Sequence, residues 1–376
     1  MDIVKEYRLN KKRDDVFDIL KGIGIILMVL GHCLGLCGAR SFIYLFHMAI
    51  FFICSGVFFK EKQYESASSL IKFSAGKIQR LYFPFALFNI FLILIHNFLL
   101  NINVYISNPE LVSPEDNNNY LFYEYYSPSK IFKLIISTLL MGHGEQLAGA
   151  TWFLRVLFWI SIASCFGHYI ARKFIKNDKY FNVVRFVIYS AALIIGFICQ
   201  RADFNFYTIG AMLSCAFLYY LGILYQKYKE RININVMSFI CSLFVLLISY
   251  YYTANTVNLS ANKYSNPVWL IISSVSGFIF ILSISKFISK TGILKSILSY
   301  IGRHTISILL FHLITFKIIT YIQLLILNKP DYMLASFTIL EWKNGWWLLY
   351  LIAGVLIPLL ISFVYGKLKS LIRSKE

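Results

Sequence analysis

Residues 18–33 read DILKGIGIILMVLGHC, an apolar run that is interrupted by Asp18, Lys21 and His32. At about 100° per residue, His32 lies about three turns beyond Lys21 and about four beyond Asp18, so the three side chains project from nearly one helical face. Ionisable groups at membrane depth cost about 2.5–3.5 kcal/mol each and usually face a bundle interior or an aqueous cavity. The pattern predicts a membrane-spanning helix with a functional polar stripe.

The rest of the chain is equally apolar. Of its 376 residues, 58% are hydrophobic and only 14% are charged, which excludes a soluble domain of this length. Residues 131–141 form an apolar stretch too short to cross a bilayer, which we interpret as re-entrant or interfacial. We expect an all-α, polytopic membrane helix bundle with ten spans, near residues 19–38, 41–59, 81–100, 152–171, 184–200, 207–225, 236–253, 267–285, 303–327 and 346–366.

The net charge of +18 is explained by membrane topology and not by nucleic acid, because the basic residues cluster in alternate loops. The basic segments are residues 5–13, 60–80, 172–185, 227–231, 286–303 and 367–375. Ten spans with both termini cytoplasmic satisfy the positive-inside rule, whereas an eleventh crossing at residues 131–141 would invert every later loop. We expect one domain over residues 1–376, with a cytoplasmic segment 1–18, spans from 19 to 366, and a cytoplasmic tail 367–376.

Cysteines and the long outer loop carry weaker signals. All seven cysteines fall within or beside apolar spans, so we expect them to be reduced and packed. Cys33 and Cys37 lie beside His32, but no further ligands can be named, and we expect no metal. The loop 101–129 is rich in Asn, Tyr and acidic residues. That composition suits contacts to sugars, and it suits a plain solvated loop equally well.

Two histidines are the best candidates for catalysis. His32 and His47 lie at similar distances before and after the turn near Arg40, so on adjacent antiparallel helices they stand at similar depth. A neutral imidazole suits general-base work near neutral pH; each histidine also has a packing interpretation. On a straight helix Asp18 is about 20 Å from His32 and cannot act as its carboxylate partner unless Gly22 and Gly24 break the helix.

Other polar residues suggest contacts to substrates. Lys77 and Arg80 lie at i, i+3 before the third span, where two cations on one face match the phosphates of a nucleotide carrier or simply mark the cytoplasmic side. Ser55, followed by Gly56, could act as a nucleophile, or the small Ser-Gly pair could allow two helices to pack closely. We favour close packing. Trp152 and Arg155, at the outer start of the fourth span, suit acceptor contacts or interfacial anchoring. For His304 and His312 we favour packing.

Five blocks of the sequence resemble those of a known protein family. They are FDILKGIGIILMVLGH, FIYLFHMAIFFICSGVFF, KIQRLYFPF, TWFLRVLFW and IGRHTISILLFH. In order and spacing they resemble the integral-membrane acyltransferase family 3, and the first two resemble most its fucose 4-O-acetylase-related branch. These proteins O-acetylate bacterial surface polysaccharides. The resemblance covers about residues 15 to 366.

The resemblance assigns roles to single residues. It implies that His32, eleven positions after Lys21, is the catalytic residue, that Lys77 and Arg80 bind the acyl-CoA donor, and that Ser55 with Gly56 matches the family's Ser-Gly pair. Ala49 stands where related sequences commonly have proline, which predicts a straighter second helix. The soluble esterase-like domain of some members is absent from this sequence.

The sequence therefore predicts a multi-pass O-acetyltransferase of the bacterial inner membrane. We expect acetyl-CoA as donor, held by Lys21, Lys77 and Arg80 near Asp18 and Ser55, and a polysaccharide or lipid-linked sugar as acceptor. Membrane lipid and glycan-assembly proteins are the other expected partners. The alternatives are a polysaccharide repeat-unit polymerase or flippase, and an acyltransferase that moves succinyl or another acyl group.

Overall fold

The computed structural model describes residues 14–35, 37–112, 118–142, 144–204, 206–253 and 256–373. It is 80% helical and its described part contains no strands, only isolated bridges. Ten helical segments there are long and apolar enough to span a membrane. The polytopic helix bundle expected from the sequence is confirmed.

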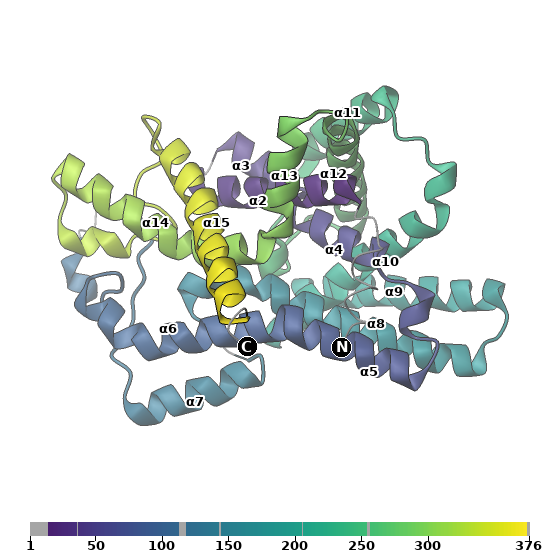
Figure 1. The fold of residues 1–376 in the computed structure, drawn as a ribbon, viewed down its shortest axis with the longest axis horizontal. Coiled ribbons are helices and arrows are strands. Elements are labelled where there is room, and N and C mark those ends of the chain that lie inside the picture. The colour runs from purple at the N-terminus through teal and green to yellow at the C-terminus, as the bar shows by residue number, and fades with distance from the viewer. Residues whose placement is uncertain are drawn as a thin grey trace.

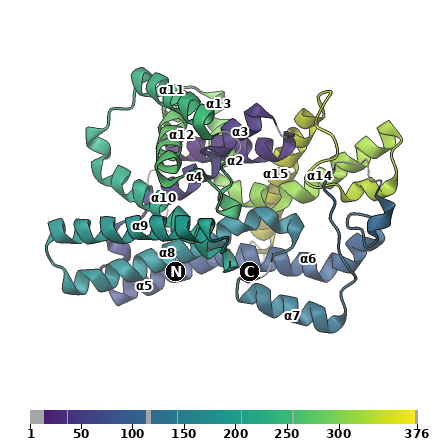
Figure 2. The same ribbon diagram turned by 180° about the vertical axis from the view of Figure 1, so that it is seen from behind.

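Most spans lie near their predicted ranges, and Figures 1 and 2 show their arrangement. The spans are α2 (Asp15–Cys33), α3 with α4 (Gly38–Tyr44 and His47–Val57), α5 with η2 and α6 (Ala67–Lys77, Ile78–Tyr82 and Phe83–Asn101), η4 with α8 (Gln146–Thr151 and Trp152–Phe174), α9 (Asp178–Arg201), α10 (Ile209–Tyr228), α11 (Val236–Thr253), α12 (Pro267–Ile288), α14 (Thr305–Leu327) and α15 (Trp346–Arg373). The third, predicted at 81–100, begins earlier, because α5 extends it into the basic stretch 60–80.

The first helix, α2, is the centre of the bundle. It packs against α3, α4, α12, α13, α14 and α15. Gly22 of α2 and Gly302 of α13 bring those two backbones so close that a side chain at either position would collide with the other helix. Helix α2 is continuous through Gly22 and Gly24, so Asp18 stays at the end opposite His32.

The short segment near 131–141 forms α7 (Pro128–Leu139), which is not long enough to span. It lies beside α6 in both views. Tyr126, just before α7, exchanges hydrogen bonds with Asn97 near the end of α6, whereas the carbonyl of Leu139 accepts a hydrogen bond from Tyr82 just before α6 begins. Helix α7 therefore runs antiparallel along α6 and is not one of the candidate spans.

Two local features differ from the sequence interpretation. The basic stretch 286–303, expected as a loop, contains the amphipathic helix α13 (Ile293–Arg303), whose Lys295 pairs with Asp15 at 2.7 Å. The second span is not straightened by Ala49, because α3 ends at Tyr44 and α4 begins at His47 after a two-residue turn. The break therefore does not depend on a proline.

Candidate active site

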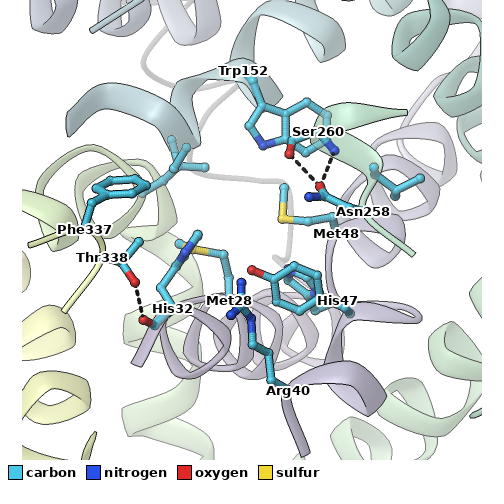
Figure 3. A pocket seen from close by; sticks show the side chains of 14 residues that line it. Met28, His32, Arg40, His47, Met48, Trp152, Asn258, Ser260, Phe337 and Thr338 are labelled. Atoms are coloured by element: carbon cyan, nitrogen blue, oxygen red, sulfur yellow. Dashed lines mark hydrogen bonds between the residues drawn. The ribbon is translucent and has the colours of Figure 1, made fainter. Parts of the chain in front are cut away.

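A polar cavity of about 210 Å³ lies at the end of α2 that carries His32 (Figure 3). His32 and His47 both line it, as their predicted equal depth requires. The other lining residues come from α2, α3, α4, η4, α8, α14 and two loops: Met28, Arg40, Tyr44, Met48, Ala150, Trp152, Asn258, Leu259, Ser260, Leu309, Phe337 and Thr338. No carboxylate is among these residues.

The break between α3 and α4 shapes the His47 side of the cavity. His47 is the first residue of α4, and its Nδ1 donates a hydrogen bond to the carbonyl of Ile43 at 3.0 Å. In the neutral ring this leaves Nε2 as the acceptor. The centroid of the His47 ring lies 4.8 Å from that of the Tyr44 ring. The guanidinium of Arg40 lies 5.1 Å from the centroid of the same Tyr44 ring. A fixed positive charge therefore stands close to the imidazole.

His32 has a second histidine as its neighbour. The ring of His312, from α14, lies 5.3 Å from the His32 ring between centroids. Nδ1 of His312 donates to the carbonyls of Ile308 and Leu309, and its buried Nε2 has no hydrogen-bond partner in the part of the chain that the structure describes. The sequence interpretation of His312 as a packing residue missed this pairing, because the two histidines are far apart along the chain.

The outer wall of the cavity is built from loops that sequence reasoning did not single out. Asn258 and Ser260 come from the loop before α12, and Phe337 and Thr338 come from the loop before α15. The hydroxyl of Thr338 donates to the backbone carbonyl of His32 at 2.7 Å. The Asn- and Ser-rich composition of residues 255–266 is the only sequence signal for the first loop.

A buried lysine in α14 holds the second of these loops. Lys317, only 6% exposed, donates from Nζ to the carbonyls of Leu334 and Ser336 at 2.9 and 2.6 Å. These carbonyls lie just before Phe337 and Thr338, so Lys317 fixes the cavity wall that touches His32. An ionisable residue within a span usually has such a role at a site.

A second cavity, of about 740 Å³, lies at the other end of α2, on the side predicted to be cytoplasmic. Asp18, Lys21 and Arg80 line it, and Lys21 pairs with Asp18 at 2.7 Å. Five cations and three acids face this space: Lys21, Lys60, Arg80, Lys229 and Lys286, with Asp14, Asp18 and Glu230. Its excess of positive charge suits an anionic ligand.

Lys77 and Arg80 do not both line this cavity. Residues Ile78–Tyr82 are π-helical, and this wider turn changes the register between the two cations. Arg80 lines the basic cavity, whereas Lys77 is not among its lining residues and lies with Nζ 5.1 Å over the Phe73 ring. An α-helical i, i+3 rule could not anticipate this separation.

Gly24 and Phe51 lie between the two cavities. Lys21 and Val57 line the basic cavity, whereas Met28 and Met48 line the polar one; Gly24 and Phe51 occupy the intermediate positions on α2 and α4. The Phe51 ring packs against Gly24, where an added Cβ would stand 3.1 Å from Cζ. The two cavities share no lining residue, and the contact between Phe51 and Gly24 lies between them.

Ser55 and its neighbour Gly56 belong to a helix contact. The Ser55 hydroxyl donates to the carbonyl of Phe51 at 2.8 Å, and Gly56 packs against the backbone of α10 at Tyr219 and Gly222. Ser55 lines neither cavity. This arrangement matches the packing interpretation of the Ser-Gly pair.

Of the two residues predicted to contact the acceptor, Trp152 and Arg155, only one lines the polar cavity. Trp152 lines the polar cavity, whereas Arg155 does not and donates instead to the carbonyl of Met141 at 3.1 Å. Arg155 therefore anchors the segment that follows α7.

Just before η4, sequence reasoning missed a buried carboxylate, because its polar flanks suggested a loop. Glu145, 1% exposed, accepts hydrogen bonds from the hydroxyls of Tyr105 and Tyr126 and lies 3.5 Å from His96. Burial and this carboxylate raise the pKa of both tyrosines above their usual value. Asn89 links the backbone N–H of Glu145 to Thr151, next to Trp152. The network thus braces the η4 side of the cavity.

The fold and the paired cavities define a multi-pass membrane protein with a buried imidazole site. Comparison with known families gives the class: the acyltransferase family 3 model, described as an acyltransferase domain, matches residues 14–367. The chain therefore belongs to this family of membrane acyltransferases. Searches of the curated proteins and of the solved structures each gave no match.

Proposed function

We propose that this acyltransferase moves an acetyl group from cytoplasmic acetyl-CoA to a sugar hydroxyl of a bacterial surface polysaccharide, such as O-antigen, capsule or exopolysaccharide. The inner membrane is its proposed location. The observation that carries the proposal is the pair of cavities on α2. A basic cavity lies at the predicted cytoplasmic end, and a polar cavity with two histidines lies at the other.

The basic cavity is the proposed donor site. Coenzyme A carries several phosphate charges, and Arg80 and Lys21 offer the charge-assisted hydrogen bonds that phosphates accept. From Lys21 to His32 is eleven residues, or about 16 Å of α-helix. The pantetheine arm of coenzyme A has a comparable extended length, so a donor bound by its phosphates can bring its thioester to His32.

Transfer along this route requires Phe51 to leave its place against Gly24. The side chain is 8% exposed and packs edge-to-face with Phe153 at 5.6 Å. A rotamer change of one ring opens the space over Gly24, where no side chain of α2 stands. In the closed state the same ring keeps water of the outer cavity from the thioester.

In the polar cavity His32 is the proposed base. It takes the proton of the sugar hydroxyl as the oxygen attacks the thioester carbonyl, and the proton then passes to the departing thiolate. Arg40 is the cation that lines this cavity and would stabilise the negative charge on the carbonyl oxygen. Trp152 supplies an aromatic face for the sugar, and Asn258 and Ser260 supply polar groups beside it.

An acetyl group carried first by the His32 ring is the other chemical route for this site. It predicts a labelled protein when labelled acetyl-CoA is added without acceptor. Direct transfer predicts no label on the protein. Rapid quenching and mass spectrometry of the α2 peptide separate the two routes.

The test of the function is the surface glycan itself. We expect His32→Ala to abolish glycan acetylation while the polymer and the protein remain present. His304→Ala is the matched control, because His304 bonds only to the carbonyl of Tyr300 in the described structure and lines neither cavity. Full acetylation by His32→Ala would refute the assignment. Loss of the polymer itself would indicate a polymerase or flippase, and a missing succinyl signal would indicate a different donor.

A further inference from the structure

A groove outside both cavities lies between α8, α9 and α10, and it has a volume of about 190 Å³. Ala163, Gly167 and Ala171 follow one another at four-residue spacing on α8, so small residues form one wall. A Cβ added at Gly167 would meet nothing within 4 Å. Ile188, on the opposite wall, is 57% exposed, so the groove opens onto the lipid-facing surface.

The inner wall of this groove carries two polar side chains. His168 and Arg185 line it, and they are only 5% and 7% exposed. Among the described residues, neither ring nitrogen of His168 has a hydrogen-bond partner, and Nε of Arg185 has none. Buried polar groups are normally satisfied, so each exception calls for an explanation. The His168 ring is surrounded by the rings of Phe59, Tyr64, Phe181 and Tyr189, so its buried nitrogens are closed off from the groove. The charge of Arg185 is therefore the feature that a ligand in the groove would answer.

The charge of Arg185 also lacks a counterpart in the described part of the chain. Its guanidinium lies 5.1 Å over the ring of Phe181 and 5.9 Å over that of Tyr220, and no ion pair there includes it. Arg172, on the neighbouring helix, is by contrast paired with both Glu61 and Asp178 at 2.9 and 2.7 Å. An uncompensated cation within a span is costly and marks a candidate binding site.

The position of the guanidinium indicates where a counter-ion would sit. Arg185 is the eighth residue of α9, about 10 Å from its start. Its Cζ lies 5.1 Å over the ring of Phe181, one turn nearer to that start, so the side chain reaches toward the predicted cytoplasmic surface. Long basic side chains reach the headgroup level in this way.

We infer that this groove binds an anionic phospholipid, with the phosphate at the guanidinium of Arg185 and the upper part of one acyl chain along Ala163 and Gly167. Arginine matches phosphate geometry, and basic pockets between transmembrane helices hold anionic headgroups. The apolar walls explain why the ligand is a lipid and not free phosphate. The site is independent of the proposed reaction, since it shares no lining residue with the two cavities.

The experiment measures lipid affinity on the purified full-length protein in detergent. The probes are phosphatidylglycerol, phosphatidylcholine and inorganic phosphate, and the readouts are native mass spectrometry and the thermal unfolding midpoint. We expect phosphatidylglycerol to bind at least tenfold more tightly than phosphatidylcholine. Arg185→Gln and Gly167→Leu should each weaken phosphatidylglycerol binding at least tenfold, the first by removing the charge and the second by filling the groove.

Gly76→Leu is the matched control, because Gly76 is a helical glycine with open space around it and lies in α5, outside the groove. It should bind phosphatidylglycerol as the wild type does. Gly167→Leu keeps the test decisive even where Arg185→Gln fails to fold. Wild-type affinity in Gly167→Leu, or equal binding of the two lipids, would overturn the inference. Equal stabilisation of the wild type and Gly167→Leu by inorganic phosphate alone would overturn the lipid assignment.

Discussion

Replacing Gly24 by alanine tests the passage between the two cavities. The added methyl group would stand 3.1 Å from Cζ and 3.3 Å from Cε2 of Phe51, closer than an ordinary van der Waals contact. It also occupies the space that a pantetheine arm needs when the ring moves aside. Donor phosphates would still meet Arg80 and Lys21, because these residues lie in the separate basic cavity.

The size of the effect follows from the packing cost. One extra methyl group in a well-packed interior costs about 1–3 kcal/mol. We expect the Phe51 ring to yield slightly in the closed state, so that this cost falls on the state in which the arm occupies the passage. Since each 1.36 kcal/mol is a factor of ten in rate, we expect acetyl transfer to fall by about 5- to 150-fold. Helix propensity favours alanine over glycine, so α2 itself is not weakened.

The assay is release of coenzyme A by membranes that contain the glycan acceptor, together with acetyl-CoA binding to the purified protein. Donor affinity should stay within about twofold of the wild type while the transfer rate falls. Gly76→Ala is the control, because its Cβ meets nothing within 4 Å. An unchanged transfer rate in Gly24→Ala would refute a passage at this position, and lost donor affinity would show that the substitution disturbs the basic cavity.

Three further predictions concern the groups that brace the site. Lys317→Met removes two hydrogen bonds that hold the wall beside His32; we expect a higher KM for the acceptor at unchanged donor affinity, and an unchanged acceptor KM would contradict this role. Tyr126→Phe deletes a hydrogen bond to buried Glu145 and should lower the free energy of unfolding by about 1.5–3 kcal/mol in denaturant titrations, whereas an unchanged value would contradict the network. Burial raises the pKa of Tyr123 to about 12, against about 10 in the unfolded chain. The contribution of Tyr123 to stability is therefore complete below pH 10 and is lost as the pH rises to about 12. The fall in stability over this pH range should be shallower in Tyr123→Phe, and an equal fall would contradict the role of Tyr123.

The sequence predicted the spans well because length and apolar composition are local properties. Helix α11, predicted at residues 236–253, begins and ends at those residues. The shared cavity of His32 and His47 was also predictable, since a helical hairpin sets their relative depth. The π-helical turn before Tyr82 was not, because it changes the register without a change in composition.

Partners that are distant in the sequence could not be predicted from one chain. His312 meets His32 across two helices, and Thr338 reaches the same residue from an outer loop. Lys317 and Glu145 are buried by tertiary packing, although an isolated lysine in a span was a visible signal. Each of these contacts depends on how the helices associate, which periodicity alone does not specify.

Sidedness of the reaction is the most direct test of the central claim, that donor and acceptor reach His32 from opposite ends of α2. Sealed right-side-out vesicles carry labelled acetyl-CoA inside only, and label is measured on glycan that a non-permeant reagent can reach from outside. We predict label on outer glycan with the wild type and none with His32→Ala. Label confined to glycan inside the vesicles, or equal outer label with the variant, would contradict the claim.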